Sequence, residues 1–91
     1  MAGPLFPLGV VVATPATIEL LEKQGMDPEQ LLTRHVSDDW EELGTEDQAL
    51  NDQAVREDLR IFSAYDLARE RLWIITEADR SATTILLPSE Y

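Results

Sequence analysis

Residues 59–87 read LRIFSAYDLARERLWIITEADRSATTILL, and this stretch decides the fold. It contains three runs rich in β-branched, aromatic and other apolar residues, a composition typical of strands. The predicted strands cover residues 59–65, 72–77 and 83–87. The connections at 66–71 and 78–81 are too short for crossovers, so the three strands should form an antiparallel meander.

The middle strand predicts how the sheet is covered. Side chains alternate between the two faces of a strand, so Leu72 and Ile74 share one face while Trp73 and Ile75 share the other. Both faces are therefore apolar at the start of this strand. Helices can cover one face, and we expect the N-terminal arm or a second copy of the chain to cover the other. The apolar surface around Phe62 and Trp73 is the reason to expect a homodimer.

The part of the chain before these strands predicts one strand and three helices. Leu8–Ala13 is apolar and β-branched, which indicates a buried strand. Each helix has a start signal, namely a capping side chain followed by proline or by a glutamine three residues later. The predicted helices begin after the caps Thr14, Asp27 and Thr45 and end near Gln24, Ser37 and Asp58.

The order β-α-α-α-β-β-β predicts an α+β fold in a single domain that spans residues 1–91. Its helices should pack on one face of a small, mainly antiparallel sheet. The third helix carries few apolar residues, so we expect it to be largely solvated. The predicted core comprises Val10, Val12, Ile18, Leu21, Leu32, Ile61, Ile74 and Leu86.

The composition is that of a globular protein with a strong negative charge. The chain has 91 residues, of which 44% are apolar and 27% charged, and its formal net charge is −11. It has no cysteine, which excludes disulfides and thiolate chemistry. No apolar run approaches the roughly 18 residues that span a bilayer, and the N-terminus lacks the basic region of a signal peptide, so we expect a cytoplasmic protein. Like-charge repulsion disfavours nucleic acid and anionic membranes as direct partners, and it favours a basic protein or a protein with a basic groove.

Most of this charge lies between residues 38 and 58, where nine carboxylates face a single cation, Arg56. Such a local excess of negative charge indicates a surface that binds a partner rather than a catalytic site. Trp40 lies at its start, either as a plug between helices or as a partly exposed anchor inside a charged rim, as in many binding hot spots. The predicted partner-binding residues are Asp38, Asp39, Trp40, Glu41, Glu42, Glu46, Asp47 and Asp52.

Two groups of residues are the candidates for chemistry. His35 could act as a general base supported by Asp38 or Asp39, or it could be a histidine held by a carboxylate or carbonyl near a helix C-terminus. Glu77 and Asp79 could divide acid and base roles, or they could stabilise a turn. We expect the structural role in both cases and no catalytic residue. With one histidine and no cysteine, the chain predicts no metal site and no cofactor.

Four sequence words add a resemblance: LGVVVATP at 8–15, RHVSDDW at 34–40, ITEADRS at 75–81 and LLPSEY at 86–91. With them, nearly the whole chain resembles a family of short plasmid-related proteins carried by proteobacterial mobile elements. Members of that family are described as hypothetical proteins and in some cases as type I restriction subunits. This chain is far too short for a methyltransferase and has no glycine-rich cofactor loop. The resemblance implies a mobile genetic element as the setting and supplies no activity or catalytic residue.

The sequence leaves three functions open. The first is an acidic, non-enzymatic protein–protein interaction module of a mobile genetic element, acting as an inhibitor or accessory factor on a basic protein surface. The second is a small hydrolase or nuclease that uses His35 with nearby carboxylates. The third is a homodimeric accessory protein with no charge-dependent partner. A DNA-binding helix-turn-helix is disfavoured because its recognition helix would bring carboxylates toward phosphate.

Overall fold

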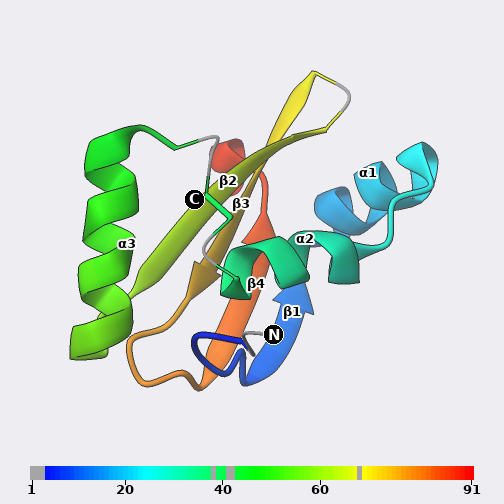
Figure 1. Ribbon diagram of the computed structural model, residues 1–91. Helices are drawn as coiled ribbons and strands as arrows, with labels where there is room; N and C mark the ends of the chain where they lie inside the picture. Colours follow the sequence, from blue (N-terminus) through cyan, green and yellow to red (C-terminus); the bar gives the residue numbers. More distant parts are fainter. Residues whose placement is uncertain (1–3, 38, 41–42, 68) are drawn as a thin grey trace.

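A four-stranded sheet forms the centre of the computed structural model, which describes residues 4–37, 39–40, 43–67 and 69–91 (Figure 1). The strands are β1 (Val10–Ala13), β2 (Ile61–Leu67), β3 (Glu70–Thr76) and β4 (Ala82–Leu86). Their order across the sheet is β1-β4-β3-β2. The β2–β3 and β3–β4 pairs are antiparallel, and β1 joins β4 in parallel. The predicted meander and its fourth strand are therefore confirmed.

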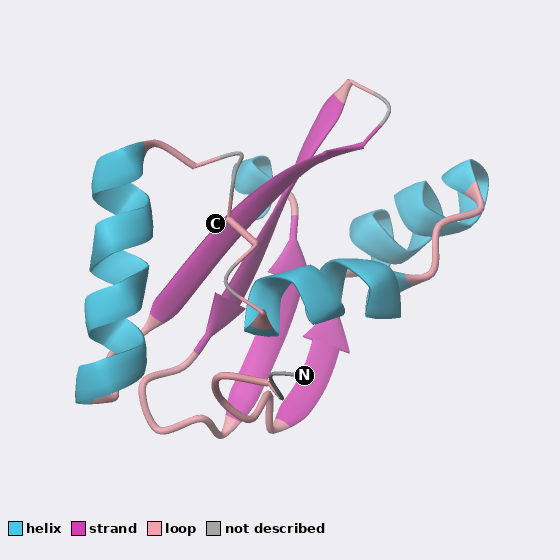
Figure 2. Cartoon of the chain, viewed as in Figure 1, coloured by secondary structure: helices cyan, strands magenta, loops and turns pink. Residues whose placement is uncertain are grey.

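Within the described residues, three helices precede the meander: α1 (Pro15–Gln24), α2 (Pro28–Val36) and α3 (Thr45–Glu57). α1 and α2 lie on one face of the sheet, and α3 stands beside β2 (Figures 1 and 2). A short 3₁₀ helix, η1 (Pro88–Glu90), follows β4. This arrangement confirms the predicted α+β fold and its β-α-α-α-β-β-β order. In the part of the chain that the structure describes, no helix has both the length and the apolar character needed to cross a membrane.

The capping signals explain the starts of the first two helices. The Thr14 hydroxyl oxygen accepts a hydrogen bond from the Thr17 backbone N–H at 3.3 Å, and the Asp27 carboxylate accepts one from the Glu29 N–H at 2.9 Å. Each cap satisfies a backbone donor that the first helical turn leaves without a partner. α1 ends at Gly25, whose φ of 63° is the left-handed conformation that glycine adopts at low cost.

The predicted start of α3 is wrong by one residue. Gly44 takes the capping position without a side-chain cap, and Thr45 is the first helical residue. The approach to the helix is fixed instead by the Gln48 side chain, whose amide donates to the Leu43 carbonyl at 2.9 Å. The end of the helix agrees with the prediction, since Asp58 caps it in the left-handed conformation with a φ of 53°.

The turn of the β2–β3 hairpin is shorter than predicted, and β2 begins at Ile61 rather than at Leu59. The sequence assigns 66–71 to a turn, but β2 continues through Leu67 and β3 already begins at Glu70. Asp66 and Arg71 face each other across the two strands, with 3.2 Å between the carboxylate Oδ1 and the guanidinium Nη1. A cross-strand ion pair favours extended strands at polar positions that composition alone assigns to a turn.

Burial confirms five of the eight predicted core residues. These are Leu21, Leu32, Ile61, Ile74 and Leu86. The prediction is wrong for Val10, Val12 and Ile18, whose exposed fractions are 66%, 46% and 45%. β1 is an edge strand that pairs only with β4 among the described strands, so its valines lack a second neighbouring strand. Ile18 stays exposed because α1 buries Thr17 and Leu21 instead.

The C-terminal segment, and not the N-terminal arm, covers part of the second face of the sheet. The Trp73 ring lies 5.6 Å from the Tyr91 ring and 5.1 Å from the Phe62 ring, and η1 contacts β3. The N-terminal arm runs along the helical side, where the Phe6 ring packs on the His35 ring at 5.2 Å. The predicted cover by the N-terminal arm is therefore wrong. The homodimer stays a prediction, with less apolar surface left to motivate it.

Candidate functional site

Trp40 is a core residue. Only 2% of its surface is exposed, and its indole N–H donates to the His35 carbonyl at 3.0 Å. It packs in one cluster with Phe6, Val36 and Leu43. The alternative in which Trp40 fills the gap between helices is confirmed, and its role as a partly exposed anchor for a partner is wrong.

Asp39 is half-buried and already paired. Its carboxylate accepts two hydrogen bonds from the Arg34 guanidinium, at 2.8 Å from Nε and 3.3 Å from Nη2. The same guanidinium lies 4.4 Å from the centre of the Tyr65 ring, and the Tyr65 hydroxyl donates to the Asp39 carbonyl at 2.9 Å. This cluster fixes the segment after α2, so Asp39 stabilises the fold and offers a partner little free charge.

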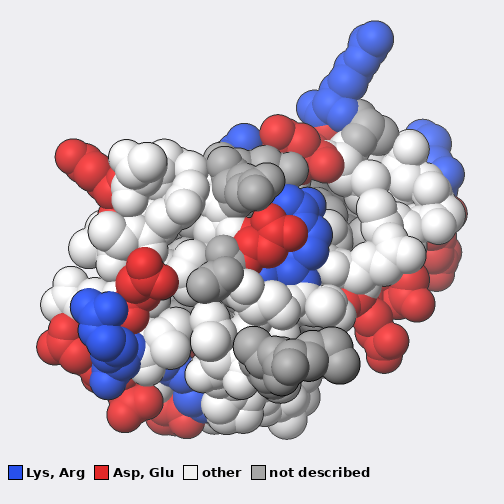
Figure 3. All heavy atoms as spheres, viewed as in Figure 1, with Lys and Arg blue, Asp and Glu red and all other residues white. Residues whose placement is uncertain are grey.

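The other described members of the predicted site lie on α3 and are exposed. They are Glu46, Asp47 and Asp52. Among its described residues, this helix buries only Asn51 and Ala54, and Leu50 is 61% exposed among the carboxylates. Figure 3 shows acidic groups spread over the α3 side of the molecule, with basic groups between them. Three further predicted residues lie outside the described residues: Asp38, Glu41 and Glu42.

Asn51 closes the edge of the sheet at β2. The Phe62 N–H donates to the Asn51 side-chain oxygen at 3.2 Å, and the Asn51 amide donates to the Phe62 carbonyl. One side chain therefore satisfies both outward backbone groups of Phe62, one of the positions at which a further strand would otherwise bind. Arg80 forms further hydrogen bonds that hold this helix, because its guanidinium donates to the carbonyls of Ala54 at 3.0 Å and Leu59 at 2.6 Å. The sequence patterns predict neither the contact of Asn51 nor that of Arg80. The only indication for Asn51 is that it lies on the same side of the helix as the buried Ala54.

His35 is fully buried within a chain of hydrogen bonds. Its Nδ1 meets the Ser63 hydroxyl, and its Nε2 lies 2.9 Å from the Thr76 hydroxyl. The chain continues from Thr76 to Thr83 at 2.8 Å, and the Thr83 hydroxyl donates to the Leu8 carbonyl at 2.8 Å. These bonds link α2 to three strands and to the segment just before β1.

The Thr83 hydroxyl, the last donor in this series of hydrogen bonds, fixes the direction of each of the others. Thr83 gives its only hydroxyl proton to Leu8, so it accepts from Thr76, and Thr76 in turn accepts from the Nε2–H of His35. Nδ1 is then the acceptor for the Ser63 hydroxyl, and the ring is neutral. Burial lowers the pKa of His35 to about 3, which agrees with this tautomer. His35 thus has a structural role, with hydroxyl partners in place of the expected carboxylate or carbonyl.

The other candidate acids make separate contacts. The Glu77 carboxylate lies 3.8 Å from the Arg60 guanidinium. The Asp79 carboxylate accepts from the Ser81 backbone N–H at 3.0 Å, and hydrogen bonds from the side chain and backbone of Ser81 lower the pKa of Asp79. Among the described residues, these acids do not meet His35 in one cleft.

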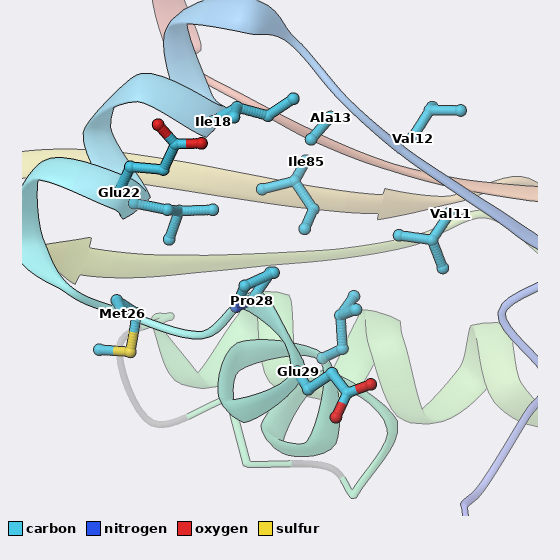
Figure 4. A pocket seen from close by; sticks show the side chains of 11 residues that line it. Val11, Val12, Ala13, Ile18, Glu22, Met26, Pro28, Glu29 and Ile85 are labelled. Carbon is cyan, nitrogen blue, oxygen red and sulfur yellow. The ribbon is translucent and has the colours of Figure 1, made fainter.

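An open groove lies at the β1 edge of the sheet, between β1 and the helices α1 and α2 (Figure 4). Its volume is about 570 Å³. Val11 and Ile85 line it from the sheet, while Ile18 and Leu32 line it from the helices. Val12 and Ile18, two of the three exposed residues that the sequence places in the core, therefore line a surface groove.

Two carboxylates are the only charged groups that line this groove within the described chain. Glu22 projects from α1 and Glu29 from α2, on two sides of the apolar centre (Figure 4). A second hollow of about 310 Å³ extends past Leu8 and Val36 and shares three lining residues with the first. Together they form a continuous apolar path along β1 and α2 with an acidic rim.

Comparison with models of protein families, with curated proteins and with solved structures finds no match for this chain.

Proposed function

We propose that the protein is an acidic, non-enzymatic protein–protein interaction module that binds a basic protein surface through α3. The observation that carries this proposal is the solvated face of that helix. Asn51 and Arg80 hold α3 firmly against the sheet, so its outer face is a rigid platform. The described carboxylates on this platform and at its C-terminal end are Glu46, Asp47, Asp52, Glu57 and Asp58.

The arrangement favours fast and salt-dependent association. Carboxylates of one sign on a rigid helix steer a basic partner toward the surface before contact is made. Leu50 lies one turn after Glu46 and two turns before Glu57, which places it on the same helical stripe. Leu50, rather than Trp40, therefore supplies the exposed apolar contact on this surface. An apolar contact inside a polar rim is typical of binding hot spots.

The resemblance to plasmid-related proteins supports a mobile genetic element as the setting and the cytoplasm as the location. In that setting an acidic module acts as an inhibitor or accessory factor on a host protein or on a protein of the element itself. A helix that carries carboxylates at both ends fits a groove that normally holds phosphate groups. The helix and a nucleic-acid backbone both present negative charges at intervals along their length. The proposal requires no cofactor and no catalytic residue.

Charge reversal on α3 tests this proposal. A basic partner captured from the host is purified, and its affinity for the protein is measured between about 50 and 200 mM salt, a range over which screening changes strongly. The double variant Glu46→Lys, Asp47→Lys should bind at least about tenfold more weakly at the lowest salt and should show a flatter salt dependence. Asp52→Lys, in the middle of the helix, should shift affinity in the same direction by a smaller factor.

A matched control separates a specific surface from net charge. Glu19 and Glu70 are exposed and line a different hollow, so Glu19→Lys, Glu70→Lys changes the net charge equally at another place. This control should retain most of the affinity. Equal losses in both double variants would mean that only net charge matters, and unchanged binding in the α3 variant would end the proposal. A melting curve on each variant checks that the fold persists.

A further inference from the structure

The outer edge of β1 presents backbone groups that have no partner among the described residues. Val10 and Thr14 donate their backbone N–H groups to carbonyls on the β4 side, at 3.0 and 3.1 Å. Because successive residues of a strand direct their backbone groups to opposite edges, the N–H and C=O groups of Val11 and Ala13 point away from β4. Among the described strands, β1 has β4 as its sole neighbour.

This edge is short, with four residues, but among the described residues it carries no lysine, proline or covering segment. Proteins guard exposed edges with lysine, proline, bulges or a covering segment, because a free edge is a template for another strand. β1 consists of three valines and an alanine, and its three valines are exposed. At the other edge of the sheet, by contrast, Asn51 of α3 binds both outward backbone groups of Phe62.

The groove beside β1 fits the side chains of an added strand. Alternate side chains of such a strand would point toward the helical face, where Val11, Ile18 and Leu32 present apolar walls. Glu22 and Glu29 flank these walls, and among the described residues neither carboxylate forms a salt bridge. Complementary charge on the occupant is therefore positive.

A second copy of the chain is a poor occupant of this edge. Each copy carries a net charge of −11, so association of two copies opposes strong repulsion. Pairing two β1 strands about a two-fold axis would also bring the Glu22 and Glu29 carboxylates of both copies to one interface. Like charges brought together in this way disfavour the pairing.

We propose that β1 and its groove bind an extended segment of another protein, whose apolar side chains enter the groove and whose flanks carry lysine or arginine. The segment adds as a further strand beside β1 and bonds to the free backbone groups of Val11 and Ala13. This surface lies at the opposite edge of the sheet from α3, so the inference goes beyond the function proposed above and either surface can fail its test alone.

A short synthetic peptide tests strand addition. The probe is Lys-Thr-Val-Thr-Val-Thr-Lys with both ends blocked, titrated into isotope-labelled protein and followed by NMR. The largest shift changes should fall on residues 10–13 and on the groove walls, and the amides of Val11 and Ala13 should become protected from exchange. Two further versions carry N-methyl groups on alternate residues, one on each set. One version should lose binding and the other retain it, because one edge of the added strand faces β1.

Removing the acidic rim tests the charge of the occupant. The double variant Glu22→Gln, Glu29→Gln should bind the peptide about 3- to 10-fold more weakly at low salt, since two attractive contacts are lost. The control Glu19→Gln, Glu70→Gln removes the same charge at a separate hollow, which Lys23 and Leu87 also line, and should bind within about twofold of the unaltered protein.

Four outcomes overturn the inference. The first is no binding up to about 1 mM peptide, which is the weakest affinity that a usable docking site would have. The second is equal binding of both N-methylated versions, which would exclude strand pairing. The third is a set of shift changes centred on α3. The fourth is a doubled mass with protected Val11 and Ala13 amides in the protein alone, which would identify a second copy as the occupant.

Discussion

The two edges of the sheet differ in whether their outward backbone groups have hydrogen-bond partners. At β2, one asparagine, Asn51, binds both free backbone groups of Phe62, and α3 stands over the edge. At β1, the backbone groups of Val11 and Ala13 face outward beside an apolar groove. Because a free edge recruits strands, this difference favours strand addition at β1.

The contrast also separates two kinds of binding. The closed edge presents carboxylates on a rigid helix, so binding there should respond to salt and to charge reversal. The open edge presents backbone groups and apolar walls, so binding there should respond to blocked amides and to apolar side chains. The two surfaces can therefore be tested independently in one protein.

The largest effect is expected at the closed edge. Asn51→Ala leaves the N–H and C=O of Phe62 without partners in a partly buried place, which should lower the free energy of unfolding by about 2–4 kcal/mol. Urea denaturation measures the loss. Gln53→Ala removes an amide from the exposed face of the same helix and should change stability by less than about 0.5 kcal/mol. A loss below about 1 kcal/mol for Asn51→Ala would show that Asn51 does not close the edge.

Acid should weaken the fold through His35, with a somewhat smaller effect. The folded pKa of His35, about 3, lies below its unfolded value of 6.5, so the unfolded chain binds the extra proton. The neutral ring therefore stabilises the fold fully above pH 6.5, and this stability is lost as the pH falls toward 3. At about pH 4.5 the loss from this one group should be about 2–3 kcal/mol.

Paired denaturation curves isolate the contribution of His35. His35→Gln should be less stable than the unaltered protein near neutrality, and the difference should shrink as the pH falls below 6.5. Carboxylates titrate in both proteins, so they cancel in the comparison. Because the added proton goes to Nδ1, the nitrogen that accepts from the Ser63 hydroxyl, this loss of stability begins at the contact between α2 and β2. Parallel pH profiles for the two proteins would contradict this account.

Arg80 should contribute less than Asn51 to the closed edge. Its guanidinium donates to the carbonyls of Ala54 and Leu59 at the end of α3, and Arg80→Ala should cost about 1–2 kcal/mol. Arg80→Lys keeps the charge but cannot reach both carbonyls with one rigid fork, so it should restore less than half of the loss. Full rescue by lysine would show that charge alone, rather than the bridging geometry, secures this end of α3.

The smallest effect is expected at the open edge. Val10→Thr and Val12→Thr together should change stability by less than about 0.5 kcal/mol, because both side chains are largely exposed and threonine has a similar strand propensity. Thermal or urea denaturation provides the measurement. A loss above about 2 kcal/mol would mean that these valines are buried in solution, by a second copy or by another part of the chain.

Much of the fold follows from local patterns in the sequence. The order of elements is predicted because β-branched runs and capping residues act locally, as Thr14, Asp27 and Gly25 do. The assignment of Val10 and Val12 to the core fails for a specific reason. A run of valines has the same composition in a strand buried on both faces and in an unguarded edge strand, and only the order of strands in the sheet distinguishes them.

The sites were harder to predict because their partners are distant in the sequence. Ser63, Thr76 and Thr83 come from three strands, yet each occupies an inward position within an apolar run. Polar residues at inward positions of adjacent strands are a signal of a buried hydrogen-bonded chain, and they could have indicated the partners of His35. Asn51 offers almost no local signal, since its role depends on the edge strand that follows α3.

Amide hydrogen exchange at the two edges tests the central claim most directly. In the free protein, the Phe62 amide should exchange slowly because Asn51 accepts its hydrogen bond, while the Val11 and Ala13 amides should exchange much faster than that of Val12, which faces β4. Addition of the lysine-flanked peptide should slow exchange at Val11 and Ala13 and leave Phe62 unchanged. Equal exchange rates for Val11, Ala13 and Val12 in the free protein, or fast exchange at Phe62, would contradict the asymmetry between a closed and an open edge.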